Sequence, residues 1–394
     1  MIIALLGRQP ELSLAELAAV FGAAQVRHLG SSAEVATEDF PIDSLGGTLT
    51  CGSIVHRLPA SGTDQACLAA ASRYITTHYA AQWHTQPAKL TLGISAHGLD
   101  VSPRAVQAIG LRLKTTLKKS SVSLRLIPNQ TAALSTATAH HNKLGRSPRR
   151  IELLIIRAGR QLIIAESRGT QNISAYAFRD RRRPRRDAFV GMLPPKLAQL
   201  MINLALGPRA LASNDSPCVL DPFCGTGTVL QEALLKGCAV LGSDLNHKMI
   251  DYTVENLDWL QATHRPAGKV LEVKQGDAMT TQWPTTPPID AVVCETYLGQ
   301  PFSAPPRPEK LAEVVGNCNH IITEFLRNLH PQLRPGTPLC IAVPAWADAA
   351  GRFTHLPLIR QLEKLGYQLT QPQPLIYHRP GQVVARQLLV LRRR

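Results

Sequence analysis

The chain has 394 residues, of which 44% are hydrophobic, and this length predicts two or three globular domains. The 43 Lys and Arg residues outweigh 28 Asp and Glu residues, a balance that favours a polyanionic partner such as nucleic acid. No run approaches the ~18 apolar residues of a membrane helix, and residues 1–6 are too short for a signal peptide. The eight cysteines lack metal-binding spacing, so we expect free thiols, no metal, no membrane and a cytoplasmic location.

Residues 1–60 show the pattern of a small α/β domain of the ferredoxin-like type. The apolar residues 1–6 predict an opening strand. Ser13 and Glu16 have the spacing of a capping box, which predicts a helix from Ser13 to Phe21 that ends at Gly22. A strand-rich segment follows, and the Pro-Ala-Ser-Gly sequence at 59–62 breaks it.

Residues 61–170 show a second α/β pattern. We expect helices over 64–79, 102–117 and 132–144, strands over 89–95 and 123–127, and a hairpin formed by 151–156 and 161–167. Many basic and polar residues in this segment suit a phosphate-contacting surface, although isolated basic residues are also common on solvated surfaces. They are Arg125, His140, His141, Asn142, Lys143, Arg146, Arg149 and Arg150.

Three stretches of this segment, 89–95 (KLTLGIS), 123–129 (SLRLIPN) and 141–144 (HNKL), resemble a THUMP domain. The resemblance implies that residues 61–170 form a THUMP domain, a module that binds the acceptor end of tRNA. It also implies that Lys143 contacts RNA.

An arginine-rich segment connects this part to the rest of the chain, and we assign residues 171–190 to a basic linker. Such a run repels itself unless it meets counter-charge, which predicts RNA contacts. A disordered basic linker is the alternative interpretation. The arginines are Arg179, Arg181, Arg182, Arg183, Arg185 and Arg186.

Residues 191–394 are organised around the stretch from Val219 to Thr228. The apolar Val219 and Leu220 predict the end of a buried parallel strand. Gly225 and Gly227 allow a tight turn and the close approach of a ligand. A helix is expected over 229–236, before Gly237. A strand, a glycine turn and a helix N-terminus together form a nucleotide-cofactor cradle.

Further acidic residues follow the ends of later predicted strands. The strand over 238–243 leads to Asp244, which could accept hydrogen bonds from both ribose hydroxyls, and the strand over 270–275 leads to Asp277, which could bind an adenine amino group. A fourth strand, 289–293, leads to Glu295. Acids at successive strand ends suit the crevice at the carboxyl edge of a doubly wound sheet. The third glycine of the dinucleotide fingerprint is missing.

This series resembles the S-adenosylmethionine (SAM) site of Rossmann-like class I methyltransferases, in the Asp-Pro-Phe-Cys-Gly-Thr-Gly-Thr form of amino-group methylases. The junction over 175–187 and 192–198 resembles that between the THUMP and catalytic domains of the tRNA guanine-N2 methyltransferases that act at position 10. The two resemblances together cover essentially the whole chain. They imply a cofactor set of Lys196 (for the carboxylate), Asp221, Phe223, Cys224, Gly225, Thr226, Gly227, Thr228, Asp244, Leu245, Asp277 and Ala278.

The fourth strand end departs from the motif of amino-group methylases, which is Asp, Asn or Ser, then Pro-Pro, then Tyr or Phe. The residues aligned with it are Cys294, Glu295, Thr296 and Tyr297, the expected catalytic set. Tyr297 keeps the aromatic group that stacks on an extruded base. Because a thiol is a weak acceptor, we expect Glu295 to take the hydrogen bond or the proton of the target amine. A structural acid at a strand end is the alternative.

The remaining pattern completes a seven-stranded sheet. Residues 301–308 contain four prolines and predict a lid or base-binding loop. Helices are expected over 311–329 and 356–365, and strands over 339–343, 375–380 and 387–391. Residues 392–394 are expected to form a solvated tail.

The sequence therefore predicts a SAM-dependent tRNA methyltransferase that acts on the exocyclic N2 amine of a guanosine. A DNA amino-methyltransferase shares the strand-end motif, but no insertion follows that is long enough for a target-recognition domain. A non-catalytic THUMP-type tRNA-binding protein with a degenerate methylase domain is the other alternative. We expect a monomer, and the sequence leaves open both the target position and the need for a small activating subunit.

Overall fold

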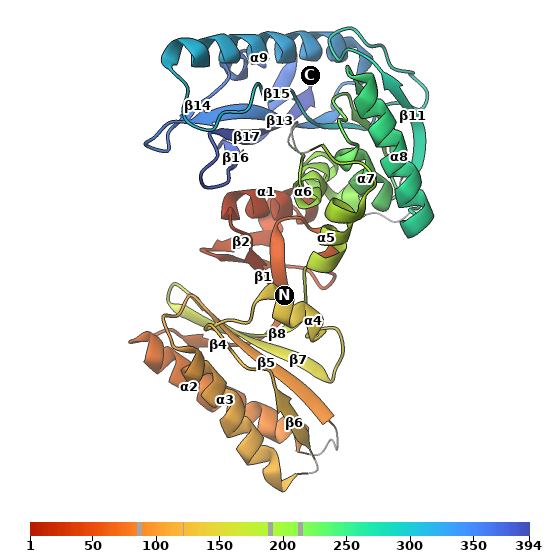
Figure 1. Cartoon of the computed structure of the whole chain (residues 1–394). Coiled ribbons are helices and arrows are strands. Elements are labelled where there is room, and N and C mark those ends of the chain that lie inside the picture. Colours follow the sequence, from red (N-terminus) through yellow and green to blue (C-terminus); the bar gives the residue numbers. More distant parts are fainter. Residues whose placement is uncertain (85–88, 121, 188–191, 212–215) are drawn as a thin grey trace. The chain divides into compact units, whose positions relative to one another are not determined.

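A computed structural model describes the whole chain except residues 85–88, 121, 188–191 and 212–215. The chain forms two compact units, residues 1–175 and 176–394. The end of the expected linker (188–190) and the expected first residue of the catalytic domain (191) lie outside the described residues. Figure 1 labels the elements of both units.

Unit 1 contains one sheet of eight strands over its described residues. In spatial order these are β2 (Val26–Leu29), β3 (Ser32–Val35), β1 (Ile2–Leu6), β4 (Thr48–Pro59), β8 (Gln161–Thr170), β7 (Arg150–Ala158), β5 (Lys89–His97) and β6 (Ser123–Leu126). Strand β4 pairs with both β1 and β8. The sheet therefore continues through the boundary expected near residue 60, and two separate domains on either side of it remain a prediction.

The helices of unit 1 are α1 (Pro10–Phe21), α2 (Asp64–Trp83), α3 (Pro103–Thr116) and α4 (Thr136–His141). Side chains alternate between the two faces of a strand. Leu153 and Ile155 of β7 join a core cluster with α2 and α3, whereas Leu154 and Ile156 join one with β1. In Figure 1, α2 and α3 lie side by side against the sheet.

Two predicted helices of unit 1 have different bounds. Helix α1 begins at Pro10, one turn before the expected start, because proline suits the first turn of a helix. The expected capping box is therefore wrong. Ser13 donates to the carbonyl of Gly47 at 2.7 Å, and the Glu16 carboxylate accepts from the backbone of residues 46 and 47.

The helix expected over 132–144 is reduced to α4. The Leu134 amide donates to the Ser95 hydroxyl at 3.0 Å, so the backbone before Ser135 is bound to β5 rather than to a helix. Ser135 caps α4, and Lys143 has a left-handed φ of 54°, which is incompatible with a continuing helix.

Unit 2 contains a nine-stranded sheet over its described residues. Seven strands follow one another in the order β11 (Lys269–Gln275), β10 (Ala239–Asp244), β9 (Cys218–Asp221), β12 (Ala291–Glu295), β13 (Pro338–Ala347), β17 (Val384–Arg393) and β15 (Tyr367–Leu369). The short strands β14 (Phe353–Thr354) and β16 (Leu375–Tyr377) pair with β13 and β17. Strands β11, β10, β9, β12 and β13 are parallel, and β17 is antiparallel to β13.

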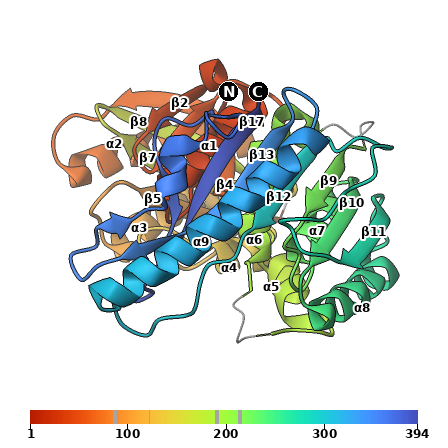
Figure 2. The same ribbon diagram turned by 90° about the horizontal axis from the view of Figure 1, so that it is seen from above.

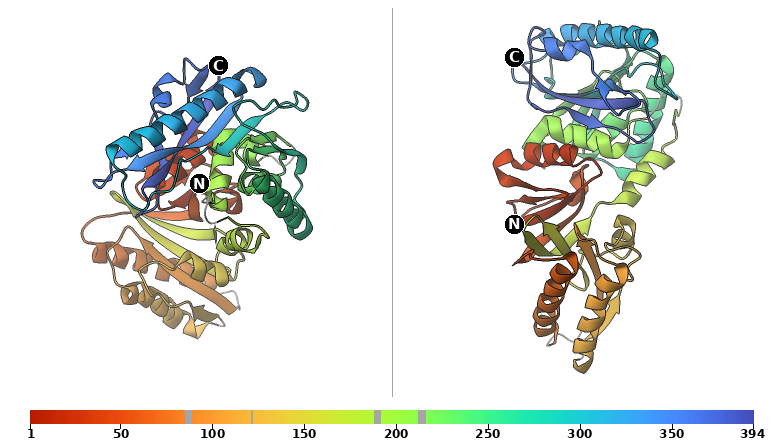
Figure 3. Two further views of the ribbon diagram at one scale, coloured as in Figure 1. Left: turned by 45° about the horizontal axis from the view of Figure 1, so that its top comes forward. Right: turned by 90° about the vertical axis from the view of Figure 1, so that its left-hand side faces the viewer.

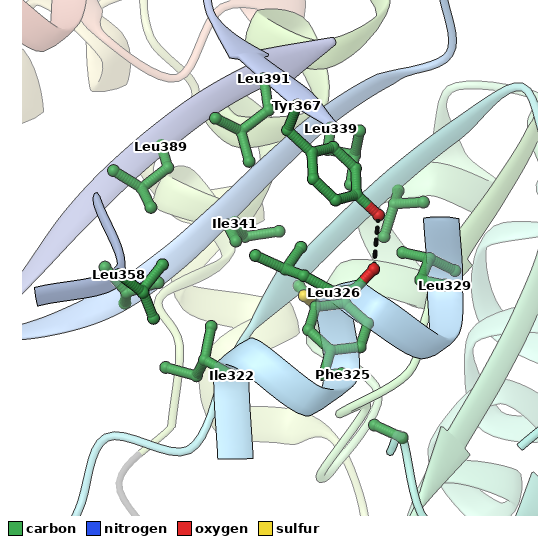
Figure 4. Packing of buried hydrophobic residues seen from close by; sticks show 14 of the residues in the cluster. Ile322, Phe325, Leu326, Leu329, Leu339, Ile341, Leu358, Tyr367, Leu389 and Leu391 are labelled. Atoms are coloured by element: carbon green, nitrogen blue, oxygen red, sulfur yellow. Dashed lines mark hydrogen bonds between the residues drawn. The ribbon is translucent and has the colours of Figure 1, made fainter. Parts of the chain in front are cut away.

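The helices of unit 2 are α6 (Pro195–Leu206), α7 (Thr228–Leu235), α8 (His247–His264) and α9 (Pro308–Leu329); α5 (Ile173–Arg182) begins in unit 1 and has most of its residues in unit 2. Helix α9 lies over the blue strands in Figures 2 and 3. Its apolar side chains pack on β13 and β17, and the Tyr367 hydroxyl donates to the carbonyl of Leu326 at 2.8 Å (Figure 4).

Several features of unit 2 differ from the sequence patterns. Strand β17 extends to Arg393, so Arg392 and Arg393 of the expected tail (392–394) belong to the sheet, where they pair with β13 and β15. The helix expected over 356–365 is reduced to the 3₁₀ turn Pro357–Gln361, because the chain turns back at Gly366 to form β15. Much of the expected linker is helix α5. The sequence analysis did not predict helix α8. No helix within the described ranges has both the length and the apolar character needed to cross a membrane.

Candidate active site

A cavity of about 800 Å³ opens where the parallel strands of unit 2 end. This volume is in the range of small-molecule and cofactor sites. The loops after β9, β10, β11 and β12 contribute to its wall, together with residues before α6 and two residues of α9. Its lining includes Met192, Leu193, Asp221, Pro222, Phe223, Cys224, Gly225, Thr226, Thr228, Val229, Asp244, Leu245, Asn246, Met249, Asp277, Ala278, Met279, Glu295, Thr296, Tyr297, Asn317 and Ile321.

The loop after β9 has the expected turn geometry. Gly225 and Gly227 have φ values of 52° and 79°, which favour glycine. A Cβ at Gly227 would lie 3.0 Å from Cγ2 of Thr253, so a side chain would also be crowded there. The Gly225 amide donates to the Asp244 carboxylate at 3.0 Å, which links this loop to the end of β10.

Four carboxyl groups converge on the cavity from four strand ends. Burial raises the pKa of Asp221 well above its usual value, and the charges of Asp244 and Glu295 add to this effect. Burial also raises the pKa of Asp244, against the backbone amides of Asn246 and Gly225 that stabilise its charged form. Crowded carboxylates disfavour one another's charge. The cavity is therefore suited to a ligand that carries positive charge.

The residues in the cavity fit SAM, whose sulfonium and ammonium groups are cationic and whose adenine base is planar. Gly225 and Gly227 have no side chains that would exclude it, and Asp244 faces the cavity with free acceptor capacity beyond its two backbone contacts. Asp277 is bound to the amide of Met279 at 2.9 Å and lies beside Ala278. The individual cofactor contacts of these residues remain predictions.

The end of β12 corrects the predicted register of the catalytic motif. Cys294 is fully buried in the hydrophobic core of the sheet and does not line the cavity, whereas Glu295, the next residue, does. Neighbouring side chains of a strand point to opposite faces. Glu295 therefore takes the position of the motif's first polar residue, and the aromatic position moves from Tyr297 to Leu298.

Glu295 forms an ion pair with Arg386 of β17, which the sequence analysis missed. Their side chains are 16% and 11% exposed. Burial raises the pKa of Glu295, and Arg386 opposes this shift. The two residues are 91 positions apart, so no local pattern indicates the pair.

Thr296 and Tyr297, the other two residues of the expected catalytic set, differ in how available their side chains are to a ligand. The Thr296 hydroxyl donates to the carbonyl of Ala342 at 3.0 Å, so this donor is already used. Tyr297 is 42% exposed and lines the cavity, where its ring is accessible to a ligand. Asn317 and Ile321 of α9 also line the cavity, and neither residue was predicted to do so.

Lys196 does not line the cavity, contrary to its expected role beside the cofactor carboxylate. Lys196 lies in the first turn of α6, which begins at Pro195, and the cavity is instead lined by Met192 and Leu193 before that helix.

The arginine-rich segment separates into buried and exposed members. Arg179 is buried and contacts the Glu232 carboxylate through two nitrogens, at 2.6 and 3.0 Å. Arg183 is also buried and donates to the Thr228 hydroxyl at 2.7 Å. Contacts of these two guanidinium groups with RNA, expected from the sequence, are excluded by their burial.

The exposed arginines are Arg181, Arg182, Arg185 and Arg186. Arg185 pairs with Glu255 at 2.7 Å. In unit 1, Lys143 is exposed and lines a separate cavity of about 120 Å³ with His140 and Arg146.

Comparisons with known proteins agree with this architecture. Residues 182–344 match the family model described as "RMKL-like, methyltransferase domain". The tRNA (guanine(10)-N2)-dimethyltransferase of Methanothermobacter thermautotrophicus is 34% identical over 177 residues, which are 45% of this chain and 46% of that protein. The protein of the same name from Methanocaldococcus jannaschii is 40% identical over 88 residues, 22% of each chain. The chain thus matches less than half the length of these curated relatives.

The crystal structure of TrmN from Thermus thermophilus aligns with all of this chain and 99% of its own, with a TM-score of 0.53 and 17% sequence identity. At this identity the likeness concerns the fold alone. The chain therefore has an α/β methyltransferase-like fold, and its residues 182–344 are similar to an RMKL-like methyltransferase domain.

Proposed function

We propose that this chain is a SAM-dependent methyltransferase that acts on the exocyclic N2 amine of a guanosine in tRNA, of the position-10 type. The cavity that joins four acidic strand ends of a methyltransferase-like sheet is the observation that carries the proposal. The partial similarity to proteins named tRNA (guanine(10)-N2)-dimethyltransferase supports the choice of substrate.

The cofactor, when bound, supplies a methyl group on a sulfonium that is already a good leaving group. The turn at Gly225 and Gly227 would hold it, with Asp244 at the ribose and Asp277 with Ala278 at the adenine. The amine nitrogen forms the new bond to the methyl carbon, the carbon–sulfur bond breaks with its electrons going to sulfur, and one proton leaves the nitrogen. Proximity and alignment provide most of the acceleration.

Glu295 is the group that handles the amine in this proposal. Its carboxylate accepts a hydrogen bond from the N2 amine, which directs the nitrogen lone pair toward the methyl group, and afterwards takes the proton. Arg386 stabilises the charged form of Glu295 that this role needs. Although Leu298 occupies the aromatic position of the motif, the exposed Tyr297 beside it lines the cavity, and in this proposal its ring stacks on the flipped base.

We propose that residues 61–170 form a THUMP domain that docks the tRNA, with Lys143 and the exposed arginines contacting phosphates. The high positive charge of the chain supports a nucleic-acid partner. We propose that the protein acts as a monomer.

One observation favours a second candidate, a non-catalytic tRNA-binding protein. With Glu295 in the first motif position, Thr296 and Tyr297 replace the two prolines and Leu298 replaces the aromatic residue. Binding of cofactor and tRNA without methyl transfer would support this candidate.

The function is tested by single-turnover methyl transfer from labelled SAM to tRNA, followed by mass spectrometry of the nucleosides. We expect N2-methylated guanosine with the native chain. Glu295→Gln should lower the single-turnover rate by about 100-fold or more, because a positioned acid or base typically contributes that much. Its affinity for S-adenosylhomocysteine should change less than about threefold, within the usual effect of one weak contact.

Glu313→Gln is the matched control, since Glu313 is an exposed acid of α9. It should retain the native rate. Full transfer by Glu295→Gln would exclude the role of Glu295, and methylation of a tRNA carrying inosine at the target would exclude the N2 amine.

The ion pair of Glu295 with Arg386 predicts that removing the arginine lowers stability in a pH-dependent way. Arg386→Met leaves a buried carboxylate unpaired and should cost about 3 kcal/mol or more at pH 7. Without Arg386 the pKa of Glu295 rises further. The variant's stability therefore falls as pH rises through this pKa, and its deficit relative to the native chain should be smaller at pH 5 than at pH 7. Urea unfolding at both pH values measures this.

The double variant Glu295→Leu with Arg386→Met provides the control. It removes both charges and should recover much of the lost stability. A deficit that is independent of pH, or additive effects of the two substitutions, would contradict a coupled pair.

The exposed arginines predict a change in the salt dependence of tRNA binding. Replacing Arg181, Arg182 and Arg186 together by Gln should reduce the slope of log K against log salt by about two to three, at ~0.7–0.9 per lost phosphate contact. Binding titrations at several salt concentrations measure the slope.

A matched triple variant, with Arg327, Arg352 and Arg360 replaced by Gln, removes the same charge from exposed positions elsewhere in unit 2. Its slope should stay near that of the native chain. Equal changes in both triple variants would show that only net charge matters and would contradict a docking role for the segment 181–186.

A further inference from the structure

Arg183 is a buried cation whose guanidinium group is incompletely satisfied. Its side chain is 1% exposed. Nη1 donates to the Thr228 hydroxyl at 2.7 Å, Nη2 lies 3.0 Å from Sδ of Met192, and Nε has no hydrogen-bond partner among the described residues. Buried polar groups in folded proteins are normally paired, so this site is suited to an additional acceptor.

The charge of Arg183 is also weakly compensated by the protein. Its acidic partner, Asp180, is 3.7 Å away and 40% exposed. The charge of the buried Glu232 also favours the charged form of Arg183, but its carboxylate is already bound by two nitrogens of Arg179. Burial lowers the pKa of Arg183, which shows that its surroundings disfavour the charged form.

The position of Arg183 at a helix N-terminus further disfavours its positive charge. Thr228 is the first residue of α7, and no side chain caps this helix. The first amide groups of a helix have no partner within the helix, and this end of the helix dipole is positive. A buried cation at such an end is unfavourable unless an anion lies close to both.

The groups that Arg183 contacts face the cavity. Thr228 and Met192 both line it, and so does Val229 in the first turn of α7. Because the Thr228 oxygen accepts a hydrogen bond from Arg183, its own proton is available to donate to a group in the cavity.

Arg183 is held firmly in this position by the neighbouring backbone. Asn256 is fully buried and exchanges hydrogen bonds with the amide and the carbonyl of Arg185, at 2.9 and 3.0 Å. The same side chain donates to the carbonyl of Thr226 at 2.9 Å. The segment with Arg183 is therefore fixed to the loop that follows β9.

We propose that Arg183, acting through the Thr228 hydroxyl and together with the first turn of α7, forms the subsite for the carboxylate at the amino-acid end of the cofactor. This inference rests on the proposed SAM-dependent function. It gives to Arg183 the role that the sequence suggested for Lys196. Arg183 is a positioning residue here, because Thr228 lies between it and the cavity.

The test compares two ligands that share the adenosine and thioether parts. S-adenosylhomocysteine carries the carboxylate, and methylthioadenosine lacks the amino-acid end. Calorimetric titration of the full chain should show that Arg183→Met weakens S-adenosylhomocysteine binding by about tenfold or more, as expected for a lost interaction with a charged group. Methylthioadenosine binding should change less than twofold, and Arg183→Lys should restore part of the lost affinity.

Thr228→Val should also lower the ratio of the affinity for S-adenosylhomocysteine to the affinity for methylthioadenosine. Because Arg183 acts through Thr228, the double variant Arg183→Met with Thr228→Val should lose less than the sum of the two single effects. Arg179→Met is the matched control: it removes another buried arginine of the same segment and should reduce stability without changing the ratio of the two affinities.

Other outcomes overturn the inference. Equal weakening of both ligands by Arg183→Met, or an unchanged ratio, would show that Arg183 has only a structural role. Similar affinities of the native chain for both ligands would show that no carboxylate subsite exists. If the folded native chain bound neither ligand, the proposed function itself would fail, and this inference with it.

Discussion

The parallel pairing of β9 with β10 and β12 is the constraint on which the site depends. Leu220 is in register with both Leu241 and Val292, so the three strands finish at one edge of the sheet. The chain places an acid at each of these ends and another after β11, which pairs with β10. The result is one cavity in which burial and the charges of Asp244 and Glu295 raise the pKa of Asp221, and this favours a cationic ligand over an anionic one.

Two buried arginines contact residues that line this cavity, and we propose a different role for each. Arg386 stabilises the charge of Glu295 at the end of β12, where an acceptor is needed. Arg183 lies behind Thr228 at the start of α7, where its acidic neighbour Asp180 is 3.7 Å away and partly exposed. In the proposed arrangement, Arg183 acts through Thr228, which lines the cavity, and offsets the acidic character of the cavity at that end. That arrangement suits a ligand with both a cationic centre and a carboxylate.

Much of this architecture could be predicted from the sequence because its signals are local. The strand, turn and helix around Gly225 and Gly227 follow from apolar residues and glycines within a dozen positions, and the structure has the same elements. The order of acidic strand ends was predictable for the same reason. The register at Cys294 was not, because a shift of one residue moves a side chain to the other face of a strand.

No local sequence pattern indicated which arginines are buried. Arg183 lies in a run of like charges, and nothing in that run separates it from the exposed Arg182; its contact with the distant Thr228 does so. The pair of Glu295 and Arg386 joins positions 91 residues apart. The false capping box at Ser13 has a different cause, since Pro10 begins the helix earlier and leaves both polar side chains to bind residues 46 and 47.

The central claim is that the cavity at the ends of β9, β10, β11 and β12 binds SAM. Calorimetric titration of the purified full chain with S-adenosylhomocysteine, beside Asp244→Asn as the cavity variant, tests it most directly. The account predicts saturable binding of one ligand per chain, weakened by Asp244→Asn. Absence of binding to a chain whose circular dichroism shows it to be folded would contradict the account.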